Sequence, residues 1–64
     1  MKDTPLDRLR HVYANHTTDG IRAIQAEEIE RYRRCRQNGN DNKAQVILAT
    51  INDFSKLIEE RETK

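Results

Sequence analysis

Cysteine is scarce in this sequence, and the scarcity bears on where the chain folds. Of 64 residues only Cys35 carries a thiol, so no disulfide can form within the chain, and a lone free thiol is typical of a reducing compartment. Residues 1–5 are followed by no apolar run of the kind that marks a secretion signal. These two features predict a cytoplasmic protein.

Tryptophan, long apolar runs and an excess of one charge are also missing. No stretch approaches the roughly 18 apolar residues that a membrane-spanning helix needs. A formal net charge of +1 argues against a general nucleic-acid or membrane binder. Isoleucine, leucine, valine and phenylalanine number 13 of 64 residues, which suffices for one small domain over 1–64 with a thin core. We therefore expect a homo-oligomer, with a dimer favoured, because small proteins often complete their core by association.

The residue types that perform catalysis are few and poorly placed. Ser55 is the only serine and has no histidine near it in the sequence. His11 and His16 are five residues apart, so on a helix they point about 140° away from each other, whereas a shared metal favours a spacing of four. Cys35 falls on a predicted core face, either as a small buried hydrophobe or as a reactive thiol among arginines. We expect no catalytic residue, no metal site and no cofactor, and therefore no enzyme.

Helical periodicity covers almost the whole chain and predicts an all-α fold. A short N-terminal helix is followed by two longer helices, and the four-residue break between these two predicts an antiparallel hairpin. Homo-oligomerisation is expected to complete the hairpin into a helical bundle, and the chain ends are expected to fray. The predicted helices cover residues of about 5–16, 20–37 and 42–60.

Capping residues mark the helix boundaries. Thr4 and Pro5 are suited to open the first helix, and Thr18 or Asp19 to open the second. Gly39 can take the left-handed conformation that closes a helix, so the second helix should end just before it.

The third helix has apolar residues on two sides. Its main stripe follows helical spacing, and Val46, Thr50 and Leu57 lie well away from that stripe. Two apolar sides predict two neighbours, one within the chain and one outside it. Val46, Thr50 and Leu57 are therefore the candidate self-association residues. The main stripe comprises Ala44, Ile47, Leu48, Ile51, Phe54 and Ile58.

Pairing the two long helices about Gly39 and Asn40 gives mostly apolar layers, such as Ile24 against Phe54. Glu28 is the exception, because it falls opposite Ile51. A small rotation can move Glu28 to the edge of the seam, an arginine of the first helix or of another subunit can pair with it, or it can serve as a functional buried carboxylate.

An arginine-rich segment in the second helix divides into two groups. Arg31 and Arg34 are expected to pair with Glu27 and Glu30, four residues before them. The remaining strip, beside Ile29, has no carboxylate on its own helix face. It suits an acidic protein partner, RNA or DNA, or simply solvent. The candidate partner-binding residues are Arg22, Ile29, Arg33 and Arg36.

Together these features predict a non-enzymatic helical interaction protein with a regulatory role, of the kind found among bacterial or phage accessory factors. The alternative is a small helical RNA- or DNA-binding regulator that uses Arg22, Arg33 and Arg36.

Overall fold

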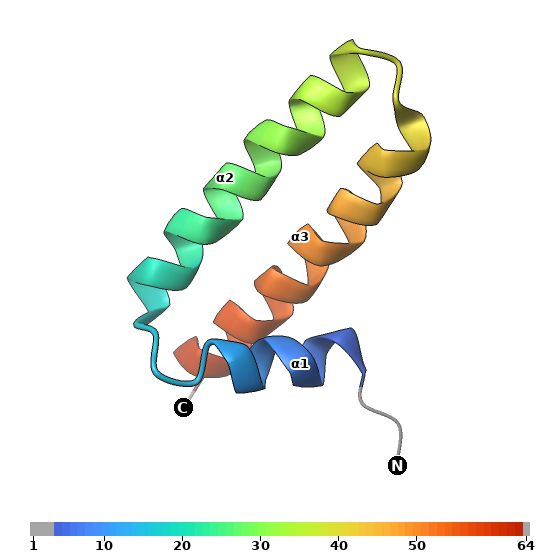
Figure 1. The fold of residues 1–64 in the computed structure, drawn as a ribbon. Coiled ribbons are helices and arrows are strands. Elements are labelled where there is room, and N and C mark those ends of the chain that lie inside the picture. The colour runs from blue at the N-terminus through green and yellow to red at the C-terminus, as the bar shows by residue number, and fades with distance from the viewer. Residues whose placement is uncertain (1–3, 64) are drawn as a thin grey trace.

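The computed structural model describes residues 4–63, which form three helices and contain no strand (Figure 1). The helices are α1 (Pro5–Val12), α2 (Thr18–Gln37) and α3 (Asp41–Glu62). Helices α2 and α3 form an antiparallel hairpin, and α1 crosses α3 at the open end of that hairpin (Figure 1). The all-α prediction is confirmed. The predicted fraying of the termini falls on residues 1–3 and 64, which lie outside the described residues.

Helix α1 begins as predicted. The Thr4 hydroxyl accepts a hydrogen bond from the backbone N–H of Asp7 at 3.1 Å, and the Thr4 N–H donates to the Asp7 carboxylate at 3.3 Å. This reciprocal pair satisfies two N–H groups that a helix start leaves without partners. Pro5 occupies the first turn, where its missing N–H costs nothing.

Helix α1 ends at Val12, four residues earlier than the sequence predicts. The reason lies in α3, whose Arg61 guanidinium donates to the carbonyl of Tyr13 at 2.7 Å and to the carbonyl of His16. A longer helix would have used the same carbonyls for its own hydrogen bonds. The chain instead turns through residues 13–17 beside the guanidinium. Arg61 lies 45 residues or more along the chain from the carbonyls that it binds.

Helix α2 begins at Thr18, and its cap is Thr17, so the prediction of Thr18 or Asp19 as the cap is wrong by one or two residues. The Thr17 hydroxyl accepts from the N–H of Gly20 at 3.0 Å. Asp19 then lies in the first turn, where a negative charge suits the helix dipole.

Gly39 closes α2 in the predicted left-handed conformation, with φ of 75°. Its N–H donates to the carbonyl of Arg36 at 3.2 Å, and the N–H of Asn40 donates to the carbonyl of Cys35 at 2.8 Å. This pair of bonds is the Schellman closure of a helix. It reverses the chain in three residues and sets α3 alongside α2.

The main core lies at the open end of the hairpin, where all three helices meet. Ile21, Phe54, Leu57 and Ile58 are buried there and pack against the half-buried Leu6, Leu9, Tyr13 and Ile24. Tyr13 and Phe54 contribute an aromatic contact with ring centroids 5.5 Å apart. Nearer the turn only Ala44 and Ile47 are buried, so the hydrophobic core thins toward that end.

Leu57 belongs to this core, which corrects its place among the self-association candidates. Its side chain is 3% exposed and packs in the cluster to which α1 contributes. The sequence predicted a second neighbour for the apolar side of α3 that carries Leu57, and at this position that neighbour is α1 of the same chain. The sequence did not indicate it because nothing local says where a short first helix will cross.

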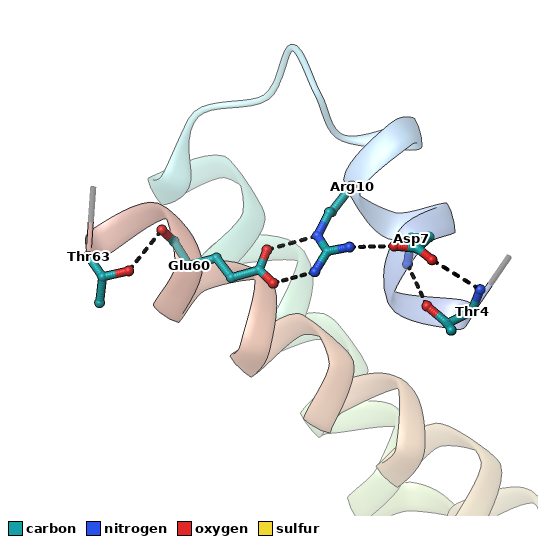
Figure 2. Close-up of polar contacts among 5 residues, drawn as sticks. All are labelled: Thr4, Asp7, Arg10, Glu60 and Thr63. Atoms are coloured by element: carbon teal, nitrogen blue, oxygen red, sulfur yellow. Dashed lines mark hydrogen bonds and ion pairs between the residues drawn. The ribbon is translucent and has the colours of Figure 1, made fainter.

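A chain of charged and polar groups holds α1 against α3 (Figure 2). The Arg10 guanidinium donates to both oxygens of Glu60, with its Nε at 2.9 Å, and also pairs with Asp7. Bidentate pairs of this kind fix orientation as well as contact. Asp7 in turn bonds to the cap residue Thr4, whose hydroxyl and N–H, together with the nearby Arg10, lower the pKa of the Asp7 carboxyl from its ordinary value.

Candidate association surfaces

Apolar side chains remain exposed along the hairpin. Val46 is 68% exposed, Leu48 39% and Ile29 37%. Isolated exposed aliphatics are normal on a protein surface. Here they lie where the core is thin and α1 does not reach, with Val46 on one side of the hairpin and Ile29 and Leu48 on the other.

Of the three self-association candidates, only Val46 is fully available. Thr50 is half-buried, and its hydroxyl donates to the carbonyl of Val46 at 3.3 Å, a bond within its own helix. With Leu57 in the core, the predicted stripe is reduced to its end nearest the turn.

One open groove runs along the side of the hairpin opposite Leu57; we call it the long groove. Its volume is about 380 Å³. Ile29 and Ala26 give it an apolar patch. Ser55 lies between the helices, where its hydroxyl accepts from the Gln25 amide at 2.8 Å. The residues that line the long groove are Arg22, Gln25, Ala26 and Ile29 from α2, and Ser55, Ile58, Glu59 and Glu62 from α3.

The predicted arginine strip does not remain a strip of free charges. Arg22 pairs across the hairpin with Glu62 of α3, and Arg33 lies 3.9 Å from Glu30 of its own helix. The expectation that no carboxylate lies near these arginines is therefore wrong: Glu30 comes from α2 itself and Glu62 from the facing helix. Arg36 has no ion pair with any residue of 4–63.

The predicted pairing of Arg31 and Arg34 with Glu27 and Glu30 is also wrong. Arg31 pairs instead with Glu28 at 3.5 Å, and Arg34 has no ion pair within the described chain. Glu28 is thus half-buried at the edge of the seam, with 22% of its side chain exposed, and its arginine comes from α2 itself. Gln25 occupies the seam as well, donating to the carbonyl of Ile51 at 3.2 Å.

A second groove, which the sequence analysis did not predict, lies near the turn on the other side of the hairpin; we call it the turn-end groove. Its volume is about 300 Å³. Three cationic side chains surround an apolar floor, and the buried Ile47 and half-buried Cys35 form that floor. Lys43 could have pointed to this groove, because α3 brings it opposite Arg31 and Arg34 of α2. Finding the groove from the sequence would have required the register in which the two helices pair. The lining residues are Arg31, Arg34, Cys35, Lys43 and Ile47.

Across residues 4–63 no three histidine, cysteine or acidic side chains come together as a metal site would require. Ser55 is engaged with Gln25, and the His16 ring packs edge-on to Tyr13 with centroids 4.9 Å apart. Both grooves place charged side chains beside apolar ones.

Comparisons with known proteins add no assignment: no family model, no curated protein and no solved structure matches this chain. Within the described residues, no helix has both the length and the apolar character needed to cross a membrane.

Proposed function

We propose that this chain is a non-enzymatic helical interaction protein with a regulatory or accessory role in the cytoplasm, acting by contact with other protein chains. The observation that carries the proposal is the exposure of Val46, on a hairpin whose own core thins toward the turn. A partner chain that covered Val46 would remove its apolar surface from water, which contributes about 25 cal/mol of binding free energy for each Å² buried.

The turn-end groove indicates the chemistry of a protein partner. Arg34 and Lys43 lie across it from each other over Ile47, and Val46 follows Lys43 by one helical turn. A segment with one apolar side chain flanked by carboxylates fits this arrangement, because each charge then meets an opposite one while the apolar group covers Ile47.

A nucleic-acid partner is the second candidate, and one observation favours it. The cationic side chains gather at the turn end of the hairpin, where Arg34 and Arg36 have no ion pair within residues 4–63. Such a site would make few phosphate contacts, so its affinity would fall with salt along a shallow slope.

Recovery of partners by the tagged full chain from its native cells, quantified by mass spectrometry, tests the proposal. Val46→Glu and the pair Arg34→Glu with Lys43→Glu should each reduce the recovery of the same protein at least tenfold. Gln45→Glu is the matched control, since it adds the same charge at an exposed position of α3 and should change nothing.

Circular dichroism must show unchanged helix content in all variants. Equal recovery by every variant would refute the proposal. Binding of RNA or DNA at low salt that Arg34→Glu with Lys43→Glu abolishes would replace it with the second candidate.

A further inference from the structure

We propose that two copies of this chain form a dimer through the side of the hairpin that carries the long groove, which we call the groove side. The two-fold axis runs parallel to the helices, so α2 of each copy packs against α3 of the other and both turns lie at the same end. The inference rests on the proposed function, association with protein chains, and names a second copy as one partner. It also places self-association on the opposite side of the hairpin from the predicted Val46.

The two helices carry opposite charges on the groove side. Within about 40° of Ile29 around the axis of α2 there are three arginines and no carboxylate. Within about 40° of Ser55 around the axis of α3 there are three carboxylates and no cation. The groove side is therefore positive along α2 and negative along α3. The exposed arginines are Arg22, Arg33 and Arg36, and the exposed carboxylates are Asp41, Glu59 and Glu62.

This charge pattern selects one orientation for a second copy. A two-fold axis parallel to the helices places α2 of each copy over α3 of the other, so positive meets negative twice in an isologous interface. An axis perpendicular to the helices would place α2 over α2, with Arg36 against Arg22, and α3 over α3, with carboxylate against carboxylate. Like charges set against each other cost affinity. The parallel axis also leaves neighbouring helices antiparallel, as in an up-and-down four-helix bundle.

Gln25 fixes the register of the hairpin. Its amide donates to the carbonyl of Ile51 at 3.2 Å and to the hydroxyl of Ser55 at 2.8 Å, so Gln25 lies level with the midpoint of these two residues. Counting from there toward the turn at about 1.5 Å per residue, Arg36 lies within about 2 Å of the height of Asp41. A rotation about an axis parallel to the helices keeps every residue at its height, so Arg36 of each copy meets Asp41 of the other. Neither residue has an ion pair with any residue of 4–63.

The other positions of the groove side match at the same register. Ile29 and Leu48, which are 37% and 39% exposed, lie within about 2 Å of each other in height, so each covers the other across the interface. Arg22 and Glu59 differ in height by about 5 Å, which their long side chains span. Arg22 pairs with Glu62 of its own chain, and Glu59 of the second copy would add a second carboxylate to that pair.

Helix α1 leaves the groove side open. It packs against the side of α3 that carries Leu57, and on a helix Leu57 and Ser55 point about 160° apart. The dimer therefore requires no rearrangement of the fold.

Sedimentation equilibrium of the full chain tests the proposal. Wild type should form a dimer that weakens as salt is raised. Arg36→Glu and Asp41→Arg should each weaken dimerisation about tenfold, because the contact occurs twice and repulsion replaces attraction. Arg36→Gln and Asp41→Asn, which remove a charge without reversing it, should each weaken it by a smaller factor. Ile29→Glu should abolish dimerisation, with unchanged helix content by circular dichroism.

Arg34→Glu is the matched control. It makes the same charge reversal as Arg36→Glu, but Arg34 points about 140° away from Ile29 around α2. The dimer should be unchanged by it.

A mixture of two variants gives the readout that is specific to a contact between chains. Arg36→Glu chains and Asp41→Arg chains should pair with each other about tenfold more tightly than either pairs with itself, because opposite charges meet at both contacts of the mixed dimer. Fluorescence-detected sedimentation with one of the two chains labelled measures this difference. An effect confined to a single chain, such as a weakened start of α3, would not be reversed by mixing.

A monomer at several hundred micromolar, or a mixture that pairs no more tightly than its components, overturns the proposal. A dimer that Arg36→Glu strengthens also overturns it, because that result belongs to an axis that sets Arg36 against Arg22. These results leave the proposed function standing if recovery of another protein still depends on Val46. Loss of that dependence, with a dimer that behaves as expected, would instead refute the wider proposed function and leave the dimer in place.

Discussion

Replacement of Leu57 by alanine should come close to unfolding this protein. Leu57 is 3% exposed and packed with Ile21, Phe54 and Ile58 in the cluster to which α1 contributes. Truncating such a leucine costs about 3 kcal/mol, the lost transfer energy plus the cavity left behind. A domain of this size is stable by only about 3–5 kcal/mol. Starting from about 4 kcal/mol, the unfolded fraction at 25 °C rises from about 0.1% to about 15%.

Urea denaturation followed by circular dichroism measures this cost. The protein concentration must be low enough that the midpoint no longer depends on it, so that association does not contribute. Val46→Ala is the matched control: it lies on the same side of α3 but is 68% exposed, and its cost should stay below about 0.5 kcal/mol. Equal costs for the two variants, or a cost below about 1 kcal/mol for Leu57→Ala, would refute the conclusion that α1 covers this side of α3.

Three further outcomes follow from particular contacts. Gly39→Ala should cost about 1–2 kcal/mol in the same assay, because φ of 75° is strained for any residue with a Cβ, while Asn38→Ala should cost much less. Arg61→Ala should speed amide hydrogen exchange in residues 13–18 and leave the middle of α2 unchanged, because Arg61 holds the carbonyls of Tyr13 and His16. Asp7 has a lowered pKa in the folded chain, so its contribution is present above the unfolded pKa of about 3.9 and is lost as the pH falls through the folded pKa. Asp7→Asn should therefore flatten the acid limb of a stability–pH profile, and an unchanged limb would contradict the Thr4 contacts.

Local signals in the sequence predicted the helices well and their ends unevenly. The Thr4 cap and Gly39 act within a few residues, so both were predicted where the structure has them. The end of α1 was not, because the residue that stops it, Arg61, lies 45 and more positions away. A helical period near residues 13–16 says nothing of a guanidinium arriving from the other end of the chain.

The candidate sites show the same limit more strongly. Ile29 and Arg36 were identified correctly as exposed positions of one face, since periodicity within one helix gives that directly. The neutralisation of Arg22 by Glu62 depends on which residues of α3 face α2. So does the turn-end groove, which combines Arg34 with Lys43. The periodicity of one helix therefore identifies only the residues that this helix contributes to a site, and not those that the facing helix adds.

The two grooves lie on opposite sides of the hairpin, so a molecule bound in one leaves the other open. Binding in the long groove would cover Ile29 and leave Val46 exposed, because on a helix Val46 points about 180° away from Ser55, which lines the long groove. The variants Val46→Glu and Ile29→Glu therefore probe separate surfaces. A partner whose recovery falls with only one of the two variants binds on that side of the hairpin.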